Sequence, residues 1–517
     1  MASMVESRTS AQAHVLRIPE LLSRIFNSLS LPVSTLEDVS KIGNLSSRPT
    51  KIIAPKTIAP ALLECHQRRS SLLAAALTCR AFSAPALNSL WEVMNSLAPL
   101  ICLLPLIEKD GADYVLLQNS TSKMWEKVAV FAARIRVFIY SDDSLYQKTG
   151  LPIHPSGYNV LVAFQPVLLP RLKTLLVRSC LKDSFAYSSL YFASPLLERL
   201  ETGTLDIGAA EHETFILTVG CRSDRLRHLS FGYLGTTPLG FSAFKTLLTA
   251  KIQTLGIRAP LTESLIAASE LPALEALAIW GTGSPPYLGS VQGFPVLRKL
   301  TLRGDADPLL RVLKACIGKL EAVTLIVTSG SNGGIKHITN LIVERWSESL
   351  RHFTLNLQGV TDSMDFTALF RSLFGIKLLS FRVLDFPGHL TSSILDVASI
   401  FPMIHTLHLP RSSPDNTPTF AQLYALTEIC PDLRSLMVSF DVNSLGGTPS
   451  FPPTGHQLDS LIINHSPITA ITPRQVAFQL DRVFPYLRNL TSIGLQAAEW
   501  EEVLDVLGIC HQARRNV

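Results

Sequence analysis

One group of residues in this chain has types that could bind a phosphate, but it lacks the residues that a phosphate-binding loop requires. Residues 329–334, Ser-Gly-Ser-Asn-Gly-Gly, are glycine-rich in the way of a phosphate-binding loop. They lack the Lys and the adjoining Ser or Thr with which such loops contact the phosphates and the metal ion. No Gly-x-Gly-x-x-Gly or Gly-x-Ser-x-Gly motif is present either. Residues 329–334 therefore predict a turn before a helix.

The candidate metal ligands are also incomplete. His405 and His408 are three residues apart, so on a strand they do not share a face, and no cysteine or carboxylate lies at ligand spacing. Cys65 and His66 precede Cys79, yet a structural zinc ion needs a fourth ligand, and none is near. We expect no catalytic residues, no cofactor and no metal, so the sequence predicts a protein that is not an enzyme.

Composition predicts a folded protein without a nucleic-acid footprint. Of 517 residues, 47% are hydrophobic and 17% are charged, which excludes a largely disordered chain. The net charge of +5 is small, and Lys and Arg are scattered rather than clustered. The eight cysteines form no Cys-x-x-Cys pair, which favours reduced thiols in the cytoplasm or nucleus.

No targeting or membrane segment is expected. Residues 1–14 lack the apolar core of a secretory signal. The longest nearly apolar run, 97–107, is much shorter than a bilayer requires. The sequence therefore predicts a cytoplasmic and/or nuclear protein that does not interact with membranes.

One short pattern repeats between Arg171 and Asn489: an apolar residue, two variable residues, a second apolar residue, one variable residue, and a third apolar residue. About thirteen copies recur at a mean spacing of about 26 residues, which is typical of leucine-rich repeats. The stronger copies begin at Leu172, Leu226, Leu274, Leu297, Leu350, Ile404, Leu433 and Leu458, and the weaker ones at Leu197, Ile252, Leu320, Leu378 and Leu487.

The repeats predict an α/β solenoid, with parallel strands on the concave face and helices on the convex face. Helical periods follow several strands, at 307–319, 335–346, 420–429 and 475–484. A proline stands shortly before many of the strands, where it ends the helix and favours an extended lead-in: Pro170, Pro195, Pro272, Pro295, Pro402, Pro431 and Pro485. The Asn that many leucine-rich repeats carry at the inner turn is missing from nearly all copies, so irregular curvature is expected.

Variable residues of the repeats should make the contacts with a partner. Directly after the first apolar residue, charge alternates along the repeats from Glu275 to Arg351, which predicts neighbouring ion pairs. A target protein on the concave side would contact exposed residues in and at the ends of strands. The candidate substrate-binding residues are Trp280, Arg303, Asn356, His408 and Asn464.

The N-terminal part has a different pattern. Residues 1–13 predict a tail, 14–96 three short helices with a long loop at 30–69, 97–123 a connector, and 124–517 the solenoid. The helical stripes comprise Ile18, Leu21, Leu22, Ile25 and Leu29, then Leu72, Leu73, Ala76 and Leu77, and then Phe82, Ala86, Leu87, Leu90 and Trp91. Three short helices bury little apolar surface alone, so they should pack on the first repeat or on another protein.

These helices resemble a known module. Residues 16–26, Leu-Arg-Ile-Pro-Glu-Leu-Leu-Ser-Arg-Ile-Phe, resemble the opening "LP-x-E-I-L-x-x-I-F" helix of F-box proteins. Residues 73–82 are similar to the "L-x-x-A-x-x-V-C-R-x-W" helix, and residues 84–91 to the closing "a-x-p-x-L-W" segment. Residues 124–127 and 131–135 resemble the start of the repeats in fungal F-box/leucine-rich-repeat proteins. The chain departs from this pattern at Ile18 and Phe82, and by about forty residues inserted after the first helix.

The resemblance implies a substrate-recognition subunit of an SCF-type E3 ubiquitin ligase, which acts in ubiquitin-dependent protein degradation. In such a subunit a small all-α F-box-like domain docks a Skp-type adaptor, and through it a cullin, while the repeats bind a target protein. The implied adaptor-binding residues are Ile18, Pro19, Leu22, Ile25, Leu73, Cys79 and Trp91. The alternative is a leucine-rich-repeat scaffold with no ligase role, whose N-terminal helices cap the solenoid.

Overall fold

The structure, a computed structural model, divides the chain into two compact units, Met1–Arg258 and Ala259–Val517. The boundary lies within the segment predicted as solenoid, and each unit is described by itself. The residues that the structure describes are 19–29, 55–95, 97–104, 107–110, 113–116, 122–140, 167–177, 192–203, 210–231, 238–258, 262–281, 293–358, 360, 365–445, 451–493 and 497–515.

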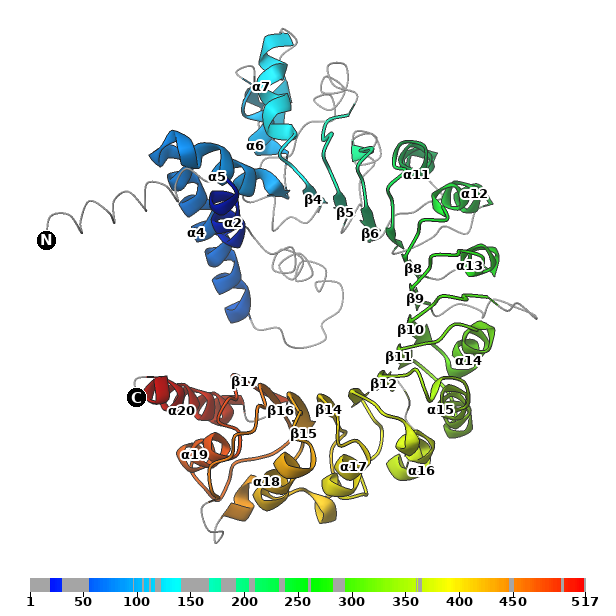
Figure 1. The fold of residues 1–517 in the computed structure, drawn as a ribbon, viewed down its shortest axis with the longest axis vertical. Helices are drawn as coiled ribbons and strands as arrows, with labels where there is room; N and C mark the ends of the chain where they lie inside the picture. The colour runs from blue at the N-terminus through cyan, green and yellow to red at the C-terminus, as the bar shows by residue number, and fades with distance from the viewer. Residues whose placement is uncertain are drawn as a thin grey trace, which may run out of the picture. The chain divides into compact units, whose positions relative to one another are not determined.

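The first unit combines N-terminal helices with parallel strands that follow one another in chain order (Figure 1). The parallel strands are β1 (Val93–Met94), β4 (Val137–Tyr140), β5 (Thr174–Val177), β6 (Arg199–Thr202), β7 (His228–Phe231) and β8 (Thr254–Arg258). β2 (Ile107–Asp110) and β3 (Asp113–Leu116) form an antiparallel pair. The helices are α2 (Pro19–Leu29), α4 (Pro55–Thr78), α5 (Arg80–Glu92), α6 (Ala98–Ile101), α7 (Ser122–Ala132), α11 (Ala210–Arg222) and α12 (Pro238–Leu247).

The second unit repeats a strand and a helical return. Its strands are β9 (Ala276–Trp280), β10 (Lys299–Gly304), β11 (Ala322–Val327), β12 (His352–Asn356), β13 (Ser380–Leu384), β14 (Thr406–His408), β15 (Ser435–Val438), β16 (Ser460–Asn464) and β17 (Asn489–Ile493). Its helices are α13 (Thr262–Ser269), α14 (Ala306–Ala315), α15 (Asn332–Trp346), α16 (Phe366–Phe370), η3 (Arg371–Gly375), α17 (Ile394–Ile400), η4 (Pro414–Asn416), α18 (Phe420–Ile429), η5 (Val442–Leu445), α19 (Pro473–Val483) and α20 (Ala497–Arg515).

The predicted fold class, an α/β leucine-rich-repeat solenoid, is confirmed. Each of the thirteen predicted copies forms a strand that begins two residues after its first apolar residue. Equivalent residues face each other in register, as Leu277 faces Leu300 and Ile279 faces Leu302. In the second unit α13 to α19 lie on one side of the parallel strands (Figure 1). We call the other side of strands β9–β17 the helix-free face, and it corresponds to the face expected to be concave.

Two further strands precede the predicted copies. β1 follows α5 directly, inside the region 14–96 expected to contain three helices and a loop but no strand, and Val93 pairs with Val137 of β4. β4 carries the same apolar pattern, with Ile135 and Phe138 buried. The N-terminal helices therefore join the parallel sheet without a linker. The predicted connector, 97–123, contains α6 and the β2–β3 pair.

The predicted loop at 30–69 is shorter than expected, because α4 already begins at Pro55. A proline in the first helical turn is well tolerated, since its missing N–H needs no partner there. The predicted helices at 420–429 and 475–484 are confirmed almost residue for residue as α18 and α19. Both begin with a capping box, formed by Thr419 with Gln422 and by Thr472 with Gln475.

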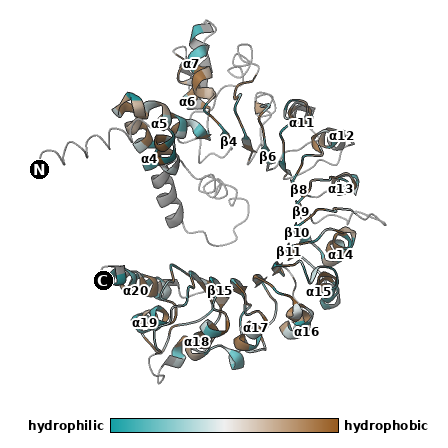
Figure 2. Ribbon diagram, viewed as in Figure 1, coloured by the Kyte–Doolittle hydropathy of each residue, from teal (hydrophilic) through white to brown (hydrophobic). Residues whose placement is uncertain are grey.

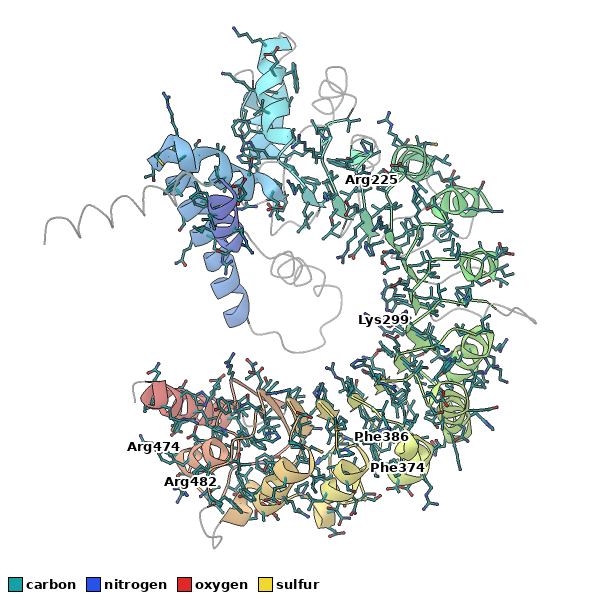
Figure 3. All side chains as sticks on the ribbon, in the orientation of Figure 1. Arg225, Lys299, Phe374, Phe386, Arg474 and Arg482 are labelled. Carbon is teal, nitrogen blue, oxygen red and sulfur yellow. The ribbon has the colours of Figure 1, made fainter. Side chains whose placement is uncertain are left out.

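Buried leucines and phenylalanines form the core between strands and helices. Figure 2 shows hydrophobic and hydrophilic residues alternating along the helices of the second unit, as helices with one buried side require. Phe381 is fully buried and its ring lies 5.4 Å from those of Phe370 and Phe401, centroid to centroid. Phe374 and Phe386 border the same cluster beside α16 (Figure 3). Such aromatic contacts fix the spacing of successive repeats.

Hydroxyl side chains bind backbone groups at inner turns that lack the usual Asn. The Ser439 hydroxyl oxygen accepts a hydrogen bond from the Ser412 N–H (2.7 Å), and that of Ser466 accepts one from the Phe440 N–H (2.9 Å). Asp305 accepts bonds from the hydroxyls of Thr328 and Ser329. These contacts connect neighbouring repeats and satisfy buried polar groups. Among the described helices, none has the length and apolar character needed to cross a bilayer.

Candidate interaction surfaces

The N-terminal helices have a small core of their own. Leu22 and Phe26 of α2 pack against Leu72 and Ala76 of α4 and against Ala86 of α5. Leu22 is only 3% exposed, and the ring of Phe26 meets that of Phe82 edge-on at 5.6 Å. Leu22, one of the predicted adaptor-binding residues, therefore stabilises this core in the isolated chain.

Trp91, another predicted adaptor-binding residue, connects the helices to the first strands. Its side chain is 9% exposed, and its ring lies 5.0 Å from that of Phe131 on α7. Arg69 on α4 donates a hydrogen bond to the Val93 carbonyl (3.3 Å), and Arg134 donates one to the Ala84 carbonyl (3.2 Å). The helices are thus held to the start of the sheet by side chains from α4, α5 and α7.

Other apolar side chains on the same helices remain exposed. Ile25 on α2 is 49% exposed, and Leu73 and Leu77, one turn apart on α4, are 48% and 79% exposed. Cys79 is exposed as well. Pro19 begins α2, and Ile18 lies outside the described residues. Of the predicted adaptor-binding residues, Ile25, Leu73 and Cys79 are thus the described ones whose side chains are open to a partner.

The strands of the second unit set which residues occupy the helix-free face. The first apolar residue of each repeat is position one; strand alternation places positions three, five and seven on this face, while four and six point into the core. Leu277 and Ile279 are buried, whereas Ala276, Ala278 and Trp280 are partly exposed. The column at position three was not among the predicted contact residues, although the same alternation places it on this face.

Trp280 and Arg303, two of the predicted substrate-binding residues, are neighbours at position seven of β9 and β10. Arg303 donates a hydrogen bond to the amide oxygen of Gln358 (3.2 Å). Asn356 and Asn464 occupy position seven of β12 and β16 and are partly exposed. Four of the five predicted residues therefore share one column of the helix-free face.

His408, the fifth predicted residue, is buried at position five of β14. Its ring Nε2 lies 3.0 Å from the Ser435 hydroxyl. Burial first, and then the charge of Arg382 on the neighbouring strand, lower the pKa of His408 to about 4. At neutral pH His408 is therefore uncharged and adds no positive charge to the face.

The ion pairs predicted at position two form only in part. Arg298 pairs with Glu321 at 3.0 Å, Lys173 with Glu198 at 3.0 Å, and Arg488 with Asp459 at 3.7 Å. Arg351 donates to the Leu350 carbonyl instead, and among the described side chains Glu275 has no ion-pair partner. The position-two backbones are hydrogen-bonded from repeat to repeat, as the Glu321 N–H is to the Arg298 carbonyl (2.7 Å). The Glu321 carboxylate, however, pairs with only one of its two flanking cations, Arg298.

The first unit has a polar recess of about 220 Å³ on strands β6, β7 and β8. Arg199 pairs there with Glu201, and the His228 ring Nδ1 lies 2.9 Å from the Thr254 hydroxyl. Burial first, and then the charges of Arg199 and Arg227, lower the pKa of His228. The recess combines both charge signs with hydroxyl groups, which suits a polar side chain of a partner.

Among the described residues, the remaining titratable groups form no catalytic arrangement. Burial raises the pKa of the Cys316 thiol to about 12 and that of Cys430 to about 11, so both thiols stay protonated and unreactive at neutral pH. Within the described ranges, no group of three or more His, Cys, Asp or Glu residues is arranged to hold a metal ion.

Comparisons with known proteins return structures only. No family model matches the chain, and no curated protein matches it. One similar solved structure is the crystal structure of the Rad7 and Elc1 complex in yeast, at 12% identity and a TM-score of 0.35, covering 86% of this chain and 95% of that chain. Another is the TLR13–ssRNA13 complex, at 12% identity and a TM-score of 0.36, covering 70% of this chain and 53% of that one.

Proposed function

We propose that this protein is a substrate-recognition subunit of an SCF-type E3 ubiquitin ligase. The N-terminal helices dock a Skp-type adaptor, which connects them to a cullin, and the repeats bind a target protein for ubiquitination and degradation. Such a subunit works in the cytoplasm or nucleus and is not an enzyme, because it brings the target near the transferring enzyme rather than supplying a reactive group.

The observation that carries the proposal is the exposure of Ile25, Leu73 and Leu77. These side chains lie on helices α2 and α4, whose sequences resemble the F-box, and they are not used by the internal core of the bundle. Burying a side chain of this size in an interface contributes about 1.5–3 kcal/mol, before the costs of association. A folded bundle that leaves three such residues in water is suited to bind another protein.

A second candidate, a repeat scaffold with no ligase role, is favoured by the way the helices join the sheet. β1 extends α5 into the parallel sheet, and Trp91 packs on Phe131. The helices thereby cover the start of the repeats, as a solenoid cap must. Capping uses the buried residues and docking would use the exposed ones, so an experiment on the exposed residues separates the two functions.

The test measures binding of a purified Skp-type adaptor to the full chain and to the variants Ile25→Asp and Leu77→Asp. Both positions are exposed, so the variants should fold normally, which circular dichroism checks. Each substitution should weaken binding about ten- to a hundredfold, since each removes about 1.5–3 kcal/mol of apolar burial. Leu22→Asp is unsuitable, because it places a charge inside the bundle core and would unfold it.

Val130→Asp on α7 is the matched control, because Val130 is an exposed apolar residue outside the F-box-like helices. It should leave adaptor affinity within about twofold of the wild type. If the wild-type chain fails to bind the adaptor at micromolar concentration, the scaffold function replaces the ligase function. An equal loss in Val130→Asp would show that the effect is not specific to α2 and α4.

A further inference from the structure

The helix-free face of the second unit carries Lys and Arg side chains that form no ion pair with any described carboxylate. None of the residues of strands β9–β17 is an Asp or a Glu. Lys299 at position three of β10 and Arg382 at position five of β13 form no ion pair with any described carboxylate. Glu321, the acidic residue beside them at position two, is already paired with Arg298. Lys299 and Arg382 are thus two cations, unpaired among the described residues, on one sheet surface, which also carries Arg303.

A row of hydroxyl groups lies between these cations. Thr301, Thr324 and Thr354 occupy position five of three successive strands and face one another in register, and Arg382 continues the row on β13. All four side chains are partly exposed. Threonine hydroxyls and a guanidinium group are hydrogen-bond donors suited to carboxylate oxygens. Lys299 extends from β10 at the side of the sheet opposite α14 (Figure 3).

Two buried polar atoms on the adjacent strands lack partners. Among the described residues, Arg382 Nε and the amide oxygen of Asn356 are buried without a hydrogen bond. An unsatisfied polar group of this kind destabilises the folded chain. Arg382 Nε is a donor to which a carboxylate could bind, whereas the Asn356 oxygen is an acceptor that needs a donor such as a peptide backbone N–H. Both atoms are closed to solvent, so a partner reaches them only when the side chains move.

The local field at this surface is positive. Burial first, and then the charges of Arg382, Lys299 and His405, lower the pKa of His352, and only Glu321 opposes them. Counting positions two, three, five and seven of the five repeats that contain β9–β13, there are five Lys or Arg residues and two Glu residues. The excess is three positive charges here, whereas the same positions of the four repeats that contain β14–β17 hold two Arg residues and one Asp, an excess of one.

We propose that the surface formed by Lys299, Thr301, Thr324, Thr354 and Arg382 binds an acidic, extended segment of a partner protein. Lys299 and Arg382 stand on strands three intervals apart, about 14 Å at about 4.8 Å per interval. Their charges are too far apart to converge on one phosphate group, and they match two carboxylates about four residues apart in an extended chain. The proposal rests on the proposed function in one respect, namely that the acidic segment belongs to the target protein that the repeats bind.

The test uses fluorescence anisotropy with the full-length protein and a labelled peptide of about ten residues, rich in Ser and Gly, with two glutamates four positions apart. The double variant Lys299→Gln/Arg382→Gln should bind at least about tenfold more weakly. The control variant Lys314→Gln/Arg474→Gln removes the same charge from exposed sites on α14 and α19 and should change affinity less than about twofold. The single substitution Lys299→Glu, at an exposed site, should weaken binding of the glutamate peptide and strengthen binding of a peptide with lysines at the same two positions.

Four outcomes would overturn the proposal. The first is an equal loss of peptide affinity in the control variant, and the second is equal affinity for a peptide whose two glutamates are adjacent. The third and fourth are tighter binding of a peptide with one phosphoserine, or of a single-stranded oligonucleotide, than of the glutamate peptide. The adaptor should bind the Lys299→Gln/Arg382→Gln protein as it binds the wild type. Peptide binding that persists without adaptor binding would refute the ligase function alone, and the reverse result would refute the acidic-segment site alone.

Discussion

Replacing His408 by Gln should remove a pH-dependent contribution to the stability of the second unit. His408 is buried on β14, and its ring Nε2 lies 3.0 Å from the Ser435 hydroxyl. Burial, and secondly the charge of Arg382, lower its pKa from 6.5 to about 4. Glutamine is uncharged throughout this range and can keep a hydrogen bond to Ser435.

The sign follows from the proton balance. Between about pH 6.5 and pH 4 the unfolded chain binds a proton at His408 and the folded chain does not, so acidification favours unfolding. The contribution is fully present above pH 6.5 and is lost as the pH falls towards 4. Two and a half pKa units at about 1.4 kcal/mol per unit amount to about 3 kcal/mol.

Urea unfolding of the wild type and of His408→Gln, followed by circular dichroism at several pH values between about 7.5 and about 4, measures this contribution. The free energy of unfolding of the wild type should fall more steeply with acidification, by about 3 kcal/mol over the range. Other histidines with lowered pKa values, such as His352 and His456, are present in both proteins and cancel in the difference. Parallel curves for the two proteins would refute the buried, neutral state of His408.

Two further predictions concern the core. Phe381→Ala should lower the unfolding free energy of the second unit by about 3–5 kcal/mol in urea denaturation, because the ring is fully buried among Phe370 and Phe401; a loss below about 1 kcal/mol would contradict this packing. In the native protein Cys316 and Cys430 should not react with a disulfide thiol reagent at pH 8, whereas after denaturation all cysteines should react. Rapid native reaction is expected only at exposed thiols, including Cys79, Cys102 and Cys221.

The strands of the repeats could be predicted from sequence because one apolar pattern serves each strand. Position four and position six must be buried, so a copy such as the one at Leu274 fixes both the strand and its register with the next copy at Leu297. Even weak copies, such as that at Leu378, form strands at the expected place. The ends of α18 and α19 could also be predicted, because Pro431 and Pro485 follow them and a proline cannot continue a helix.

The first strands and the start of α4 could not be predicted with the same rule. β1 has only two residues, Val93 and Met94, and becomes a strand because β4 lies beside it, which is a tertiary effect. The segment 55–69 contains Pro55 and Pro60, and its apolar residues are grouped at 58–63 without continuing a helical period, so the pattern does not identify a helix. Its helical conformation depends on continuity with the packed part of α4 at Leu72 and Ala76.

Which apolar residues of the N-terminal helices are buried could not be predicted either. Leu22 and Ile25 lie on the same predicted stripe, yet Leu22 faces α4 and α5 while Ile25 faces water. An apolar stripe wide enough for two contacts does not show which of its residues pack inside the protein and which stay exposed for a partner. That division decides which variants test docking and which only test folding.

The cations of the helix-free face show how a repeat fold separates stability from recognition. The buried positions of each repeat are fixed by the core, so outward residues can change with little effect on folding. Exposed Lys299 needs no partner, because water screens it. Arg382 differs, since its Nε is buried with no hydrogen-bond partner among the described residues, and its charge lowers the pKa of two neighbouring histidines, His352 and His408. An outward-facing cation that pairs with no described carboxylate, on strands that contain no Asp or Glu, fits an acidic partner that binds it.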